Sequence, residues 1–176
     1  MRALLIMTLG GWIVGTVLMA FVATQNFRTV DRLLSAPTPK FSHALTPIGH
    51  DEARVVLRYL VSELNRLYFS AWGLTQLALG VAVVIAAIGL RPLDRTMIAV
   101  TATILAIVIV SLLLSQSIVS LGRSLDFVPR VMVSEQAARF RTLHLAYTAL
   151  DLLKLSLCVW LLIRATRQTY TAVMKR

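Results

Sequence analysis

Four long apolar stretches constrain the fold of this chain more than any other feature of its sequence. They cover residues 3–24, 67–90, 96–114 and 142–165. A helix rises about 1.5 Å per residue, so roughly 20 apolar residues cross the hydrocarbon core of a bilayer, which is about 30 Å thick. Helices are favoured there because they satisfy every backbone polar group within their own segment. The sequence therefore predicts an all-α integral membrane protein, with residues 1–176 forming one domain built as a bundle of four transmembrane helices.

Composition and charge agree with this prediction. Hydrophobic residues make up 57% of the chain and charged residues 15%, whereas soluble globular domains have about 45–50% apolar and about 25% charged residues. The net charge of +10 comes from basic residues that mostly flank the apolar stretches, as expected for contacts with lipid headgroups. A nucleic-acid-binding module would instead gather them on one soluble face. We expect the lipid bilayer, and not nucleic acid, to be the partner of these charges.

The distribution of basic residues also bears on orientation. They are densest in the short turn at residues 91–95 and in the tail after residue 165, although the longer connections on the opposite side hold more of them in total. The positive-inside rule gives most weight to short loops and to the ends of the spans. We therefore predict a multi-pass protein of the bacterial inner (cytoplasmic) membrane, with both termini in the cytoplasm.

The connections between the stretches carry their own signals. We expect the first helix to end at Gln25 and Asn26, and the prolines that follow predict an extended loop over residues 35–49. Asp51 suits the first turn of a helix, and the apolar residues after it recur every three or four positions. This pattern predicts an amphipathic helix that leads into the second span. A helical extension that begins near Glu135 is expected to lead into the fourth.

A stripe of polar side chains runs through the fourth stretch. His144, Tyr147, Asp151, Lys154 and Cys158 follow one another at intervals of three or four residues, which places them on one face of a helix. A charge at the middle of a membrane span costs about 3 kcal/mol or more and therefore marks a candidate functional site. Two interpretations stay open for Asp151 and Lys154. They form an ion pair that orients the helix or docks it to another chain, or they relay protons or ions, with Asp151 as the exchanging carboxylate.

A second set of polar residues lies where the predicted spans meet the longer connections. Its members are amides and charged side chains that we expect to converge on one layer: Gln25, Asn26, Glu63, Asn65, Arg66, Gln116 and Arg141. This layer is either an interfacial pocket for a quinone, a lipid headgroup or a small polar ligand, or a hydrogen-bonded layer that fixes the helix register. In the connection before the fourth span, Arg123 and Asp126 are predicted to pair with each other.

Catalytic motifs are absent from the sequence. It contains no nucleophile elbow, P-loop, dinucleotide glycine motif or zinc signature, and a single cysteine cannot form a thiolate metal site. We therefore predict no catalytic residue, no metal site and no cofactor. Haem b or a quinone near His144 and Arg141 stays an alternative, but a second haem ligand would have to come from His43, His50 or a methionine. The competing interpretation is that His144 bonds to Glu63 or Tyr147.

Several segments resemble an uncharacterised family of bacterial four-helix membrane proteins, which is related to the transmembrane-protein-205-like proteins. The resemblance lies in the first helix up to residue 27, in residues 62–69, in residues 121–130 and in residues 140–154. Together these segments touch most of the chain, although each motif is short. The resemblance implies a four-span helical fold, and it implies no reaction.

These observations lead to three functional hypotheses. The first is a non-catalytic membrane protein that acts as an accessory or anchoring subunit or as a small homo-oligomer. Gly11 and Gly15 in the first stretch support it, since such a pair lets another helix approach closely. The second is a small transporter or a proton- or ion-coupled carrier that uses Asp151 and Lys154. The third is a redox membrane anchor that binds haem or quinone.

Overall fold

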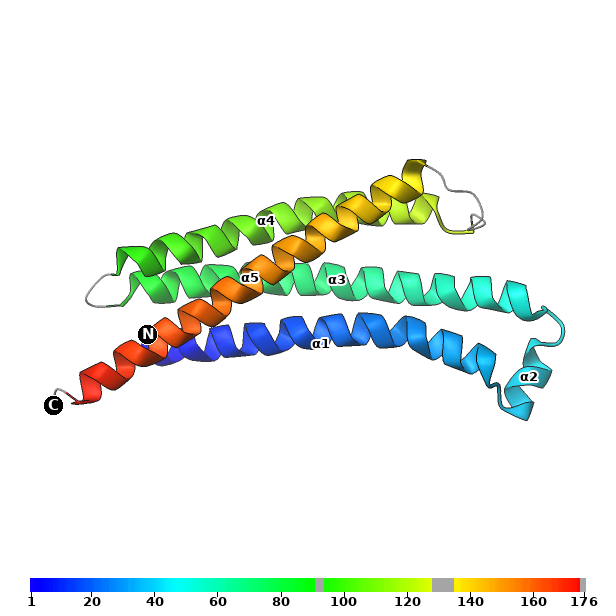
Figure 1. The fold of residues 1–176 in the computed structure, drawn as a ribbon, viewed down its shortest axis with the longest axis horizontal. Coiled ribbons are helices and arrows are strands. Elements are labelled where there is room, and N and C mark those ends of the chain that lie inside the picture. The colour runs from blue at the N-terminus through cyan, green and yellow to red at the C-terminus, as the bar shows by residue number, and fades with distance from the viewer. Residues whose placement is uncertain (91–93, 128–134, 175–176) are drawn as a thin grey trace.

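The computed structural model describes residues 1–90, 94–127 and 135–174. Within these residues the chain forms five α-helices: α1 (Arg2–Ser35), α2 (Pro39–Leu45), α3 (His50–Ile88), α4 (Arg95–Ser124) and α5 (Glu135–Met174). The four long helices pack side by side as an antiparallel bundle in which α1 lies against α3, α3 against α4, α4 against α5, and α5 against α1. Figure 1 shows that α5 runs obliquely across the others. Each long helix is long and apolar enough to cross a membrane, which confirms the predicted all-α four-helix architecture.

The helices extend well beyond their apolar stretches. With 39 residues in α3 and 40 in α5, each is about 60 Å long, or twice the hydrocarbon thickness of a bilayer. The predicted amphipathic helix and the predicted extension are continuous with the spans that they precede. We call the end of the bundle with the α1–α3 and α4–α5 connections the loop end, and the opposite end, where the chain starts, the terminal end (Figure 1).

Two expectations about the loop end were wrong. The first helix does not end at Asn26 but continues to Ser35, because its last turns bury Val30 and Leu34 against α3. The expected extended loop contains the short helix α2, which the Thr38 hydroxyl caps by accepting a hydrogen bond from the Phe41 amide at 3.4 Å. The helix that contains the third apolar stretch also extends beyond that stretch, to Ser124. Burial and capping thus extend helices where local polarity suggested an end.

The bundle has two hydrophobic cores. The inner core lies toward the terminal end and includes Leu5, Leu9, Trp12, Val83, Met97, Ile104, Cys158 and Leu161. The outer core lies at the loop end, where Val30, Leu34, Ala53 and Val61 pack with Leu45 of α2 and two further apolar side chains. Burial of apolar area contributes about 25 cal/mol per Å². The outer core therefore holds α1, α2 and α3 together beyond the apolar stretches.

Asp94 links the start of α4 to α5 at the terminal end. Its carboxylate accepts hydrogen bonds from the amides of Thr96 at 3.0 Å and Met97 at 3.2 Å, so it caps the helix. The same carboxylate accepts a bond from Arg164 Nε at 2.9 Å. Residues 91–93 of the expected tight turn lie outside the described residues, but the antiparallel arrangement of α3 and α4 agrees with that prediction.

Candidate functional site

Lys154 lies at the middle of α5 and is almost completely enclosed, with 2% of its surface exposed. Its ammonium donates hydrogen bonds to Asp151 Oδ1 on the same helix and to Gln76 Oε1 on α3. The indole Nε1 of Trp12, on α1, donates to the same Gln76 oxygen at 3.3 Å. We call these residues, together with Tyr147, the central polar cluster. It connects three of the four long helices through one amide.

Two glycines flank Gln76 on α3 and make room for α4. A Cβ at Gly73 would lie 2.6 Å from Leu112 of α4, and a Cβ at Gly80 would lie 3.0 Å from Leu105 of the same helix. Because both positions lack a side chain, α4 approaches the face of α3 that carries Gln76. The Lys154 ammonium also lies 6.0 Å from the centroid of the Trp12 ring, at the limit of a cation–π contact.

The two members of the ion pair have different surroundings. Lys154 is buried, whereas the Asp151 side chain is 28% exposed. A buried ammonium without a counter-charge would be strongly destabilising, so the nearby carboxylate offsets much of the cost of enclosing Lys154. The Asp151 carboxylate accepts the Lys154 bond and keeps part of its surface at the outside of the bundle.

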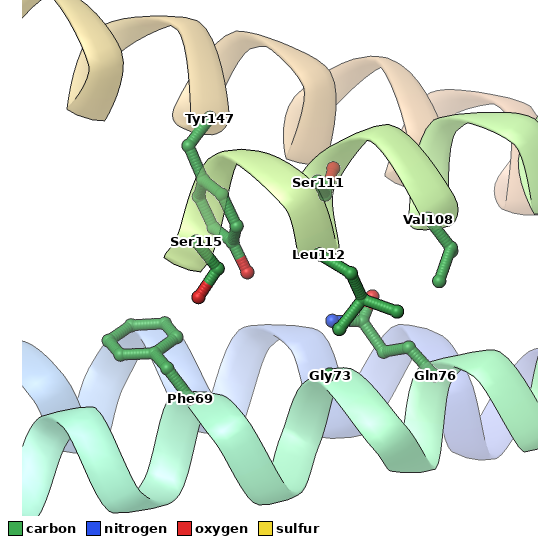
Figure 2. A pocket seen from close by; sticks show the side chains of 8 residues that line it. All are labelled: Phe69, Gly73, Gln76, Val108, Ser111, Leu112, Ser115 and Tyr147. Carbon is green, nitrogen blue, oxygen red and sulfur yellow. The ribbon is translucent and has the colours of Figure 1, made fainter. Parts of the chain in front are cut away.

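A small cavity lies beside the central polar cluster, between α3, α4 and α5 (Figure 2). Its lining combines four polar side chains with apolar ones: Gln76, Ser111, Ser115 and Tyr147 with Phe69, Val108 and Leu112, beside Gly73. Figure 2 shows the Tyr147 hydroxyl directed into the space between α3 and α4. The cavity volume of about 10 Å³ is that of a single water molecule, and a polar lining of this kind suits one.

The predicted polar stripe therefore divides along α5. Tyr147, Asp151 and Lys154 come together, and Cys158 lies in the inner core. His144 is exposed, and its ring stacks on Phe140 with centroids 6.0 Å apart. Neither expected partner of His144 takes that role, because Glu63 pairs with arginines and the Tyr147 ring meets Phe69 edge-on at 6.2 Å.

Sequence reasoning did not identify Gln76 and Trp12 as the partners of Lys154. Gln76 is the only amide side chain within residues 67–90, and its place between Gly73 and Gly80 marks a closely packed face. This signal could have pointed to it. Trp12 gives no comparable signal, because an indole in an apolar stretch is also an ordinary core residue.

The expected single polar layer at the loop end is two separate clusters. In the first, Asn26 Nδ2 donates to Asn65 Oδ1 at 2.7 Å, and Asn65 Nδ2 donates to the Ala23 carbonyl oxygen at 3.3 Å, which joins α1 to α3. The second joins α3 to α4 through Glu63 and Arg66. Residues 63 and 66 share one side of a helix whereas residue 65 lies on another, so the three side chains of α3 cannot converge.

The second cluster, which we call the boundary ion cluster, consists of Glu63, Arg66, Arg123 and Asp126. Arg66 Nη1 lies 2.9 Å from Asp126 Oδ2 and also pairs with Glu63, while Arg123 Nη2 lies 3.5 Å from Glu63 Oε2. This corrects the predicted pairing of Arg123 with Asp126, since each binds a residue of α3 instead. A separation of three residues in the sequence did not decide the pairing, because Asp126 lies past the end of α4 and α3 supplies a partner for each residue.

Three other members of the expected layer stay apart from both clusters. Gln116 and Arg141 are exposed and Gln25 is half-buried. None of the three makes a side-chain hydrogen bond or ion pair within the described ranges. The candidate site is therefore the central polar cluster, with the boundary ion cluster as a second polar centre.

Neither a metal site nor a known relative points to a function for the chain. Among the residues that the structure describes, no group of three or more His, Cys, Asp or Glu side chains is placed to hold a metal ion. Comparisons of the chain with protein-family models, with curated proteins and with solved structures find no match. The resemblance to the transmembrane-protein-205-like family therefore stays a prediction, and the functional argument rests on geometry.

Proposed function

We propose that the chain is a non-catalytic, multi-pass protein of the bacterial inner membrane that acts through contacts with other membrane chains or with a second copy of itself. The observation that carries this proposal is the enclosure of Lys154. Its charge is balanced by Asp151 and bonded to Gln76 inside one chain, beside a cavity with room for one water molecule. The pair therefore fixes the register of α5 against α3, and contact with partners falls to the outer surface of the bundle.

The glycines of α1 indicate one part of that surface. A Cβ at Gly15 would meet the Trp72 ring, whereas a Cβ at Gly10 or Gly11 would have no atom within 4 Å. Glycine in the middle of a helix costs about 1 kcal/mol relative to alanine, and Gly11 gains no internal packing in return. Small residues on the outside of a membrane helix allow a second helix to approach its backbone. This supports a contact between α1 and another chain.

Replacing Gly11 by leucine tests the proposal. We expect Gly11→Leu not to lower the thermal stability of the isolated chain. It should reduce co-purification with partner chains, or the dimer fraction, by about tenfold, because the side chain blocks close approach. The measurement is native mass spectrometry of protein purified from its own membrane in mild detergent. Val17→Leu is the matched control, since Val17 is also exposed on α1 but lies about 120° away from Gly11 around the helix. A wild-type chain that is monomeric and free of partners would contradict the proposal.

A second candidate, a small proton-coupled carrier, is favoured by one observation. The Asp151 carboxylate is 28% exposed, and a water-sized polar cavity lies next to the same cluster, so a protonatable group and a water position lie close together. This candidate predicts proton flux into liposomes that contain the purified chain, reported by an enclosed pH-sensitive dye, and its loss in Asp151→Asn. Asp31→Asn, a carboxylate at the loop end, should keep the flux. If liposomes that contain the wild-type chain are no more permeable to protons than empty liposomes, proton transport is excluded.

A further inference from the structure

A surface cavity of about 350 Å³ lies between α3 and the last turn of α4. It is lined by Tyr59, Glu63, Arg123, Asp126 and Phe127, so it includes three of the four residues of the boundary ion cluster. Its volume falls within the range of about 300–1,000 Å³ that is typical of small-molecule sites. The central polar cluster and the outer surface of α1 are not part of it.

The position of this cavity along α3 corresponds to the edge of the apolar belt. Glu63 precedes the apolar stretch by four residues, which is about 6 Å along the helix, and the headgroup layer on each side of a bilayer is about 5–8 Å thick. Exposed apolar side chains continue past this level, since Leu60 is 54% exposed and Val56 is 55% exposed. The cavity is therefore placed where lipid headgroups meet the protein.

The lining of the cavity offers groups for both signs of charge. Arg123 has a 62% exposed side chain, and its contact with Glu63 at 3.5 Å is the longest in the boundary ion cluster. An exposed guanidinium with only a long contact to its carboxylate partner can bind a phosphate, to which it donates paired hydrogen bonds. The rings of Tyr59 and Phe127 lie 4.9 Å apart, and aromatic faces attract ammonium groups. Glu63 lies beside them as a counter-charge.

The backbone at Phe127 is held in an uncommon conformation. Its φ of +67° lies in the left-handed region, which costs a side-chain-bearing residue about 1 kcal/mol or more. The residue before it is anchored to α3, because the Asp126 carboxylate is bound to Arg66. As a result the Phe127 ring, 64% exposed, stays next to Tyr59. A strained and exposed aromatic residue of this kind fits a ligand clamp better than it fits a packing role.

We propose that this cavity binds the zwitterionic headgroup of a membrane phospholipid. The Arg123 guanidinium leaves its long contact with Glu63 and holds the phosphate, while Glu63 and the rings of Tyr59 and Phe127 hold the ammonium. The cavity lining holds two acids, Glu63 and Asp126, and one base, Arg123, so the cavity has no excess positive charge to favour an anionic lipid. Arg66 and Asp126 stay paired and keep α4 against α3.

Native mass spectrometry of the full chain in mild detergent tests this site. Phosphatidylethanolamine and phosphatidylglycerol with identical acyl chains are the probes, titrated separately. We expect the wild-type chain to retain phosphatidylethanolamine preferentially. Arg123→Gln should weaken that binding by about tenfold or more, since it removes a charge-assisted hydrogen bond. Tyr59→Leu should weaken it by about two- to fivefold through the lost cation–π contact.

The control variant is Arg139→Gln, because Arg139 is an exposed arginine of α5 that does not line the cavity. It should bind phosphatidylethanolamine as the wild-type chain does. Equal retention of the two lipids by the wild-type chain would overturn the proposal, as would equal losses in Arg123→Gln and Arg139→Gln. If Arg123→Gln fails to fold, Tyr59→Leu decides alone, and unchanged binding in that variant overturns the proposal.

Discussion

Replacing Asp151 by leucine is expected to destabilise the bundle by about 3–5 kcal/mol, the range found when one partner of a buried ion pair is removed. The change leaves the Lys154 ammonium enclosed, at 2% exposure, with Gln76 as its remaining oxygen partner. Lys154→Met should cost less, because the Asp151 carboxylate that it leaves behind is 28% exposed. We therefore expect the two single substitutions to differ, with the loss of the acid more damaging than the loss of the base.

The double variant with Asp151→Leu and Lys154→Met should recover most of the lost stability. Apolar residues of similar volume often replace a buried ion pair at little cost, because both desolvated charges disappear together. The free energy of unfolding in mixed detergent micelles, measured for the wild type and three variants, closes a double-mutant cycle. Leu152→Ala on the outer face of α5, where Leu152 is 60% exposed, gives the background effect. Additive single effects in this cycle would show that the pair does not act as a unit.

The contrast between α5 and its partners shows what local sequence could predict about the site. Helical spacing alone places Asp151 next to Lys154, because two residues three positions apart lie on the same face of any α-helix. The bonds from Lys154 and Trp12 to Gln76 depend on how three helices are aligned along their axes. That alignment is set by close contacts such as Gly15 of α1 against Trp72 of α3, which no periodicity within one helix reveals.

The same distinction explains the errors at the loop end. Apolar stretches predicted the number and order of the long helices, because hydrophobic length is a property of each segment. The continuation of α1 past Asn26 depends on burial of Val30 and Leu34 against α3, and the bond from Asn26 to Asn65 removes the reason to expect a helix end there. The pairing of Arg123 with Glu63 is also a tertiary outcome. Long-range contacts override local preference in each of these cases.

Gly15→Ala is expected to destabilise the chain by about 1–3 kcal/mol, the usual cost of overpacking. A Cβ at this position would lie 2.9 Å from Trp72 Cζ3 and closer still to Cη2. The indole is packed against the inner core, so it cannot turn away without disturbing further contacts. Gly11→Ala on the same helix is the matched comparison. It should be neutral or stabilising by up to about 1 kcal/mol, because its Cβ meets nothing within 4 Å and alanine favours helix.

Thermal unfolding of the two alanine variants in detergent separates internal packing from outer contact in the glycine pair of α1. If Trp72 causes the cost at Gly15, then adding Trp72→Phe to Gly15→Ala should destabilise by less than the sum of the two single changes, since the smaller ring leaves room for the new methyl group. Equal effects of Gly15→Ala and Gly11→Ala would refute the assignment of Gly15 to the α1–α3 contact. The predicted difference instead assigns one glycine of the pair to the fold and leaves Gly11 available to a second chain.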